Sequence, residues 1–176
     1  MSILKFLGLG RESESGGAPE TETVRKIVRQ LDALPPARAR YLAAFAYLLS
    51  RVAHADLEVS DTETRAMERQ VAEVGGLPEA QAVLVVEIAK SQSRLFGGTE
   101  NFLVSREFKE VATPEERRRL LSCLFAVSAA DDSVSGTEEN QVRQIASELG
   151  FSHAEFVAAR MEVRDKRDVL KGLPSR

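Results

Sequence analysis

The sequence predicts an all-α protein, a bundle of about eight helices made of two pseudo-symmetric repeats. Apolar residues recur at intervals of three and four along most of the chain, and the strict alternation typical of strands is absent. The pattern of residues 52–63 also returns seventy-five positions later, at residues 127–138. Self-similarity at one fixed spacing indicates one supersecondary unit used twice.

Length and composition are those of a single globular domain. The 176 residues are 43% apolar and 29% charged, which allows one hydrophobic core. A net charge of −3 argues against the basic surface of a nucleic-acid-binding protein. Cys123 is the only cysteine, so an intramolecular disulfide and a Cys-rich zinc site are excluded. We therefore expect a cytoplasmic protein in which Cys123 is a buried thiol.

The N-terminal residues are expected to lie outside the domain. Met1–Gly10 is apolar apart from Lys5, yet it is too short to span a membrane and no small-residue cleavage site follows it. It is expected to dock on its own domain or to fray, with a membrane or a partner as the alternative. Arg11–Pro19 is polar and contains Gly and Pro, as is typical of a disordered linker.

Helical periodicity begins at Glu20, and helix-breaking residues divide it into segments. Pro35-Pro36 ends the first segment, and Gly75-Gly76 suits a left-handed cap at the end of the third. Gly97-Gly98 separates the two halves. The expected helices span residues 20–34, 37–56, 60–74, 78–93, 100–111, 113–130, 135–149 and 152–163.

Two further start signals lie in the second half. Thr113-Pro114-Glu115-Glu116 combines a cap, a proline at the first helical position and a glutamate that closes a capping box. Ser152-His153-Ala154-Glu155 is another capping box. The expected organisation is a leader and linker at 1–19, a domain at 20–164 with repeats at about 37–93 and 113–163, and a fraying charged tail at 165–176.

An aspartate stands at the end of an apolar stripe in each copy. In the first copy, apolar residues from Leu42 to Val52 step by three or four, and the next step falls on Asp56. The stripe of the second copy ends in the same way on Asp131. This spacing predicts that both aspartates point inward from the last turn of a helix.

Glu63 and Glu138 lead the stripes of the following helices, so an inward orientation is predicted for them as well. Ser60-x-x-Glu63 and Ser135-x-x-Glu138 are also capping boxes, which is a sufficient structural reason for both glutamates.

The aspartates lack such a reason. A carboxylate in the last helical turn faces the negative end of the helix dipole, and partial burial beside a second carboxylate adds to the cost. Exposed amides of the next helix, an arginine of the other repeat or a bound metal ion are the candidates that balance this charge. An all-oxygen site favours a hard divalent cation such as calcium, magnesium or manganese.

The spacing does not fit an EF-hand. That loop needs a glutamate at its twelfth position. Counting from Asp56 the twelfth position is Met67, and counting from Asp131 it is Val142.

The two acidic segments resemble a known family. Ala55-Asp56-x-x-Val59-Ser60-x-x-Glu63 and Ala130-Asp131-x-x-Val134-Ser135-x-x-Glu138 are similar to the Ala-Asp-Gly-Glu-Val/Ile-x-x-x-Glu signature of TerB-like proteins. This family is named for tellurite resistance and includes a domain of some membrane-bound DnaJ-type cochaperones. The second half is closest to the small stand-alone members, through Pro114-Glu115-Glu116-Arg117 and Leu149-Gly150-Phe151-Ser152.

The resemblance covers about residues 20–164 and implies an all-α fold of two pseudo-symmetric units. It also implies metal ligands at Asp56, Glu63, Asp131 and Glu138. The sequence departs from the signature at Leu57 and Asp132, which replace its glycine, and at Ser133, which replaces the following glutamate. Asp132 is therefore an alternative ligand in the second copy.

No catalytic residues are expected. His54 and His153 are predicted to be solvated, no nucleophile–base pair or phosphate-binding glycine loop is present, and Arg117-Arg118-Arg119 is most simply an exposed helix face.

The resemblance implies a non-enzymatic stress-response module that works with other proteins of a stress-response or membrane-associated complex. The alternative is a protein–protein interaction domain whose acidic residues only cap helices; an acid/base enzyme with paired carboxylates is the weakest hypothesis.

Overall fold

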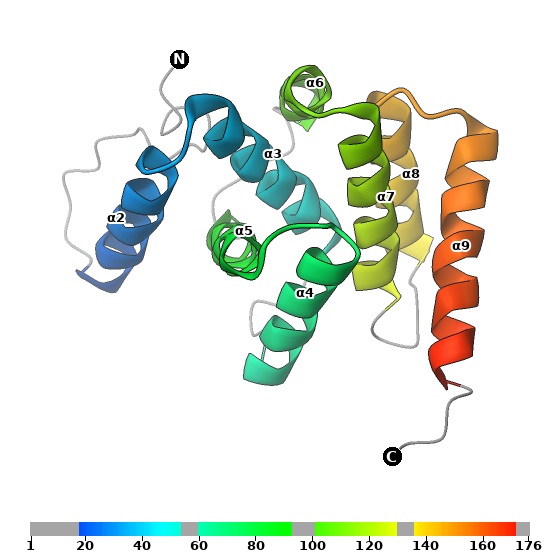
Figure 1. Cartoon of the computed structure of the whole chain (residues 1–176), viewed down its shortest axis with the longest axis horizontal. Coiled ribbons are helices and arrows are strands. Elements are labelled where there is room, and N and C mark those ends of the chain that lie inside the picture. Colours follow the sequence, from blue (N-terminus) through cyan, green and yellow to red (C-terminus); the bar gives the residue numbers. More distant parts are fainter. Residues whose placement is uncertain (1–17, 54–59, 93–100, 130–135, 172–176) are drawn as a thin grey trace.

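The computed structural model describes residues 18–53, 60–92, 101–129 and 136–171, and these residues form helices and turns with no strand (Figure 1). Each helix begins close to its expected start, so the prediction of an all-α bundle is confirmed. The helices are α2 (Ala18–Asp32), α3 (Pro36–Val52), α4 (Asp61–Glu73), α5 (Glu79–Gln92), α6 (Asn101–Val111), α7 (Pro114–Ser128), α8 (Gly136–Glu148) and α9 (His153–Lys171).

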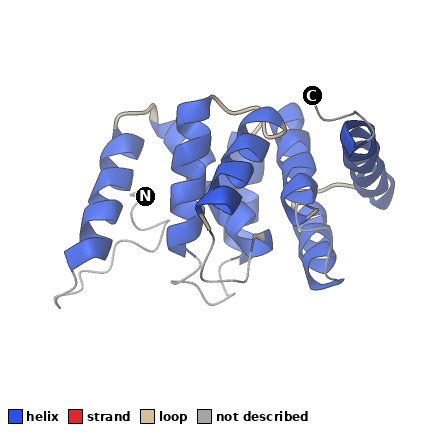
Figure 2. Cartoon of the chain, turned by 90° about the horizontal axis from the view of Figure 1, so that it is seen from below, coloured by secondary structure: helices blue, strands red, loops and turns tan. Residues whose placement is uncertain are grey.

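The helices are spread along the long axis of the molecule, with α2 at one end and α9 at the other (Figures 1 and 2). Helix α3 packs against α5, α6, α7 and α8, and α4 packs against α5 and α7. Helix α7 also packs against α8 and α9. The helices expected in the two copies are therefore present, whereas the pseudo-symmetry between the copies stays a prediction.

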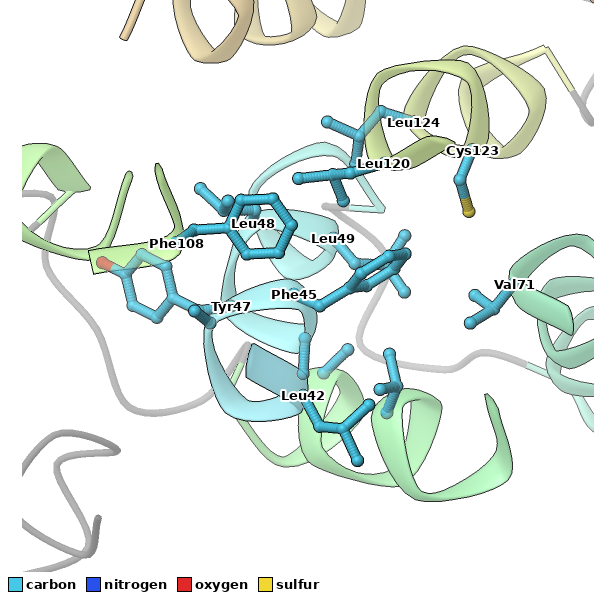
Figure 3. Packing of buried hydrophobic residues seen from close by; sticks show 14 of the residues in the cluster. Leu42, Phe45, Tyr47, Leu48, Leu49, Val71, Phe108, Leu120, Cys123 and Leu124 are labelled. Atoms are coloured by element: carbon cyan, nitrogen blue, oxygen red, sulfur yellow. The ribbon is translucent and has the colours of Figure 1, made fainter. Parts of the chain in front are cut away.

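Helix α3 is the centre of the core. Every residue from Tyr41 to Leu49 is buried, so this part of the helix is enclosed on all sides. Figure 3 shows Phe45 between side chains of α7 and Val71 of α4, with Phe108 of α6 nearby. The aromatic rings of Phe45 and Phe108 meet edge to face, with centroids 6.2 Å apart. The single apolar stripe expected for this helix was therefore too narrow, because an enclosed helix is apolar on every face.

The expected caps account for several helix ends. Thr113 and Glu116 form a capping box at the start of α7, with Pro114 in the first turn. Gly76 and Gly150 have φ of 70° and 86°, which is the left-handed conformation expected where a helix ends in glycine. At Gly150 the two backbone bonds of a Schellman motif are present, one from Gly150 to Ser147 and one from Phe151 to Ala146.

Three helix ends differ from expectation. Helix α3 ends at Val52 and α7 at Ser128, so neither helix reaches its aspartate. Helix α9 continues past the expected end at Val163 as far as Lys171. No glycine or proline interrupts this segment before Gly172, and an ion pair between Glu162 and Lys166 supports the helix at i, i+4 spacing.

Within the described ranges, no helix has the length and apolar character needed to cross a membrane.

Candidate functional site

Two of the four predicted metal ligands, Asp56 and Asp131, lie outside the residues that the structure describes. The other two are in equivalent positions, Glu63 in the first turn of α4 and Glu138 in the first turn of α8. The inward orientation of the aspartates stays a prediction, and the helices that were expected to carry it end at Val52 and Ser128.

Glu63 is exposed, so its predicted inward orientation was wrong. Its Oε2 accepts hydrogen bonds of 2.7 Å from both the amide and the hydroxyl group of Ser60. The Glu63 amide in turn donates to the Ser60 hydroxyl at 3.2 Å, which completes the capping box. The cap holds the Glu63 side chain at the N-terminus of α4. The side chains of this helix that face the core come later, at Met67 and Val71.

The capping box also affects the charge of Glu63. The Ser60 hydroxyl group, followed by the Ser60 amide, stabilises the carboxylate and lowers its pKa. Glu63 is therefore an anion at neutral pH, which is the form that binds a cation.

Glu138 is half-buried at the start of α8. Ser135, its expected capping partner, lies outside the described residues. The stripe expected to follow Glu138 is confirmed, because Val142, Ile145 and Leu149 are all buried. Glu138 therefore lies at the start of α8, a helix with one buried apolar face, directly after the acidic segment.

The described residues do not by themselves form a metal site. No group of three or more His, Cys, Asp or Glu side chains among them is arranged to hold an ion. Two of the predicted ligands, Asp56 and Asp131, lie in the undescribed segments 54–59 and 130–135, so this observation does not test the prediction that the paired Asp and Glu residues bind metal.

The sequence also singled out one cysteine and two histidines as possible reactive or metal-binding residues. Cys123 is fully buried as predicted, and burial raises the pKa of its thiol to about 12. His153 is exposed as predicted and stacks on Phe156, whereas His54 lies outside the described residues. Neither described group is a candidate for catalysis or metal binding.

The basic run on α7 is only partly a solvated surface. Arg118 and Arg119 are exposed, as expected, and Arg119 pairs with Glu115 one turn earlier. Arg117 is half-buried, and its Nη1 donates to the Leu149 carbonyl at 3.5 Å, a long contact at the end of α8. A cation at the C-terminus of a helix is favourable, so Arg117 has a structural role.

The structure contains a buried ionic cluster that the sequence reasoning missed. Arg51 of α3 and Glu148 of α8 have side chains only 7% and 11% exposed. Nη1 and Nη2 of Arg51 donate to the two carboxylate oxygens of Glu148 at 2.7 and 3.2 Å. The hydroxyl group of Ser105, which is fully buried on α6, donates to Glu148 Oε2. This cluster joins three helices that are distant in the sequence.

The charge of Glu148 follows from this environment. Burial alone raises the pKa of the carboxyl group, but the hydrogen bonds from Arg51 and Ser105 and the charge of Arg51 outweigh it, so the pKa is lowered. The signal that could have found the cluster is Arg51 itself, a cation in the last turn of α3 that follows the long apolar run Tyr41–Leu49.

Comparison with known proteins gives the same family that the acidic motifs resemble. A family model described as "Tellurite resistance protein TerB" matches residues 42–161, from the middle of α3 into α9. The match includes both acidic segments. Neither the curated proteins nor the solved structures give a match to the chain. Since the matched region is more than half of the 176 residues, the chain belongs to the TerB family.

Proposed function

We propose that this TerB-family chain is a non-enzymatic module of the response to tellurite or a related chemical stress. In this proposal it binds divalent cations through paired Asp and Glu residues, Asp56 with Glu63 and Asp131 with Glu138. The observation that carries the proposal is the family match over residues 42–161, which includes both copies of the acidic motif. We further propose that it acts in the cytoplasm on other proteins of a stress-response or membrane-associated complex.

The helix boundaries support two equivalent sites. One acidic segment connects the end of α3 to the start of α4, and the other connects the end of α7 to the start of α8. Each segment contains an aspartate and leads to a glutamate in the first turn of the next helix. Oxygen ligands of this kind suit calcium, magnesium or manganese.

The capping box of Glu63 restricts how this residue can contribute. Its Oε2 is bonded to Ser60, and the start of α4 carries the positive end of the helix dipole, which opposes a cation. Glu63 is charged, however, and can share its carboxylate between the cap and an ion. The aspartates are therefore expected to supply most of the affinity, with Glu63 holding the start of the helix.

A second function, that of an interaction domain without metal, is favoured by one observation. The capping box formed by Ser60 and Glu63 is complete without a cation, so it gives Glu63 a sufficient structural role. In this alternative the acidic residues shape the loops, and the helix surfaces bind partner proteins.

Thermal melts in EDTA and in excess calcium, magnesium or manganese chloride separate the two functions. An ion at 100 times its dissociation constant stabilises the native state by about 2.7 kcal/mol, equivalent to about 5–10 °C for a chain of this size. Asp56→Asn and Asp131→Asn should each reduce this shift, and the double variant should abolish it. Asp165→Asn, at an exposed position of α9, is the matched control and should leave the shift unchanged. If none of these ions raises the melting temperature, the interaction domain without metal is favoured.

A further inference from the structure

Two large apolar side chains are exposed next to each other at the start of α6. Phe102 is 62% exposed and Leu103 is 54% exposed, and both lie in the first turn of the helix. Within the described ranges they are the only two neighbours in sequence that expose large apolar side chains in this way. Covering such a pair is favourable because it removes apolar surface from water.

The packing of α6 gives these two residues no role in the core. The core side of the helix is formed by other residues, Val104 and Phe108, which are 3% and 0% exposed. Phe108 meets Phe45 edge to face, and Ser105 belongs to the buried ionic cluster. Helix α6 is therefore held in place on one side, and Phe102 and Leu103 lie on the part of its surface that faces water.

The same chain contains an apolar segment that could cover this pair. Seventeen residues precede α2, which begins at Ala18. The first ten of them, the leader, combine a single charged side chain with five large apolar residues, Ile3, Leu4, Phe6, Leu7 and Leu9. The leader and the exposed pair on α6 thus have matching apolar character.

The leader is long enough to reach α6. Helices α2 and α6 both pack on α3, which lies between them in Figure 1. Two spacings between helix axes and the length of α2 together come to about 40 Å. An extended chain from Phe6 to Ala18 also spans about 40 Å. The other exposed large apolar residues, Met161 and Val169, lie on α9 at the opposite end of the molecule from α2.

We infer that Phe102 and Leu103 are the docking site of the leader, residues 3–9. Docking covers both apolar surfaces at once, and the covalent link gives the leader a high effective concentration at this site. Because α6 lies within the TerB match and the leader lies before it, the contact attaches the N-terminal residues to the family domain.

The test uses the full chain with a nitroxide on Ser2→Cys, since the native Cys123 is fully buried. The amide NMR signals of the first turns of α6 should lose at least half of their intensity through paramagnetic broadening, whereas those of α9 keep theirs. Phe102→Ser with Leu103→Ser should restore the α6 signals. The matched control, Met161→Ser with Val169→Ser, removes the other exposed apolar pair and should leave the broadening unchanged.

A reciprocal variant changes the leader and leaves α6 intact. Phe6→Ser with Leu7→Ser should restore the α6 signals as fully as Phe102→Ser with Leu103→Ser does. Broadening of α6 that survives either double variant would overturn the inference, because the contact would not then depend on the apolar residues assigned to it.

A mixed sample separates docking within one chain from pairing of two chains. The isotope-labelled chains carry no nitroxide and the nitroxide-labelled chains carry no isotope, so broadening arises only between chains, and the α6 signals should stay intact. Broadening in this sample would show that a second copy covers the pair and would overturn the inference. A leader that does not broaden α6 would do the same. In that case vesicles of phosphatidylcholine and phosphatidylglycerol that sediment wild type, but not Phe102→Ser/Leu103→Ser, would assign the pair to a membrane.

Discussion

Arg51 and Glu148 form a two-pronged ion pair that joins the last turn of α3 to the last turn of α8. Ser105 of α6 bonds to the same carboxylate, so one buried contact links three helices. Removing two charges from water is costly, and here the cost is offset by a bidentate geometry and an additional donor.

Breaking this pair on one side should be strongly destabilising. Arg51→Met leaves the Glu148 carboxylate without its cation in an almost enclosed position, and we expect a loss of about 3 kcal/mol in the free energy of unfolding. Arg51→Met combined with Glu148→Met removes both charges and should recover most of that loss. Urea unfolding measures both effects. Arg106→Met, which breaks an exposed pair with Glu110, is the control and should stay within about 0.5 kcal/mol of wild type. A single Arg51→Met variant as stable as the control would contradict the role assigned to the pair.

The same cluster predicts how stability depends on acid. The folded pKa of Glu148 lies below its ordinary value near 4.5, since the bonds from Arg51 and Ser105 outweigh burial. Its contribution is therefore complete above that ordinary value and is lost as pH falls through the lower folded pKa. The urea midpoint of wild type should fall more steeply below pH 4.5 than that of Glu148→Gln. Parallel curves for the two chains would show that Glu148 does not contribute this acid dependence.

The left-handed glycines give a prediction about helix ends. Gly76 and Gly150 have positive φ, a conformation that costs most other residues about 1–2 kcal/mol. Gly76→Ala and Gly150→Ala should each lower the free energy of unfolding by roughly this amount. Asparagine tolerates this region better than alanine, so Gly150→Asn should be less harmful than Gly150→Ala. If asparagine and alanine prove equally harmful, something other than backbone conformation sets the cost.

Burial of Cys123 predicts an unreactive thiol. With a pKa of about 12 and no exposure, the thiolate is almost absent at pH 8. A disulfide reagent such as DTNB should modify Cys123 only as fast as the native chain opens. A chain with Cys123→Ala and Ala154→Cys carries its thiol at an exposed position of α9 and should react at once. Rapid labelling of the native wild-type chain would show that the core around Cys123 is accessible.

The helices could be predicted from the sequence because their ends are specified locally. The Thr113–Glu116 and Ser60–Glu63 boxes and the glycine at position 76 depend on residues close together in the chain, and all three are present. The extension of α9 to Lys171 was missed because its charged composition was interpreted as a tail, although nothing in it breaks a helix.

The contacts between distant segments could not be predicted in this way. Arg51 and Glu148 are 97 positions apart, and no periodicity within either helix indicates the other. For Glu63 the sequence allowed both an inward ligand and a capping residue, and only the geometry of the Ser60 box decides how it lies. Asp56 and Asp131 lie outside the described residues, so their orientation stays a prediction.

The enclosure of α3 has a mechanical consequence. The part of α3 from Tyr41 to Leu49 is close-packed on every side, so it cannot bend or turn without opening contacts. The acidic segment that carries Asp56 starts directly beyond the end of this helix. A displacement imposed there therefore shifts the buried part of α3 as a unit, together with the helices packed on it, α5, α6, α7 and α8.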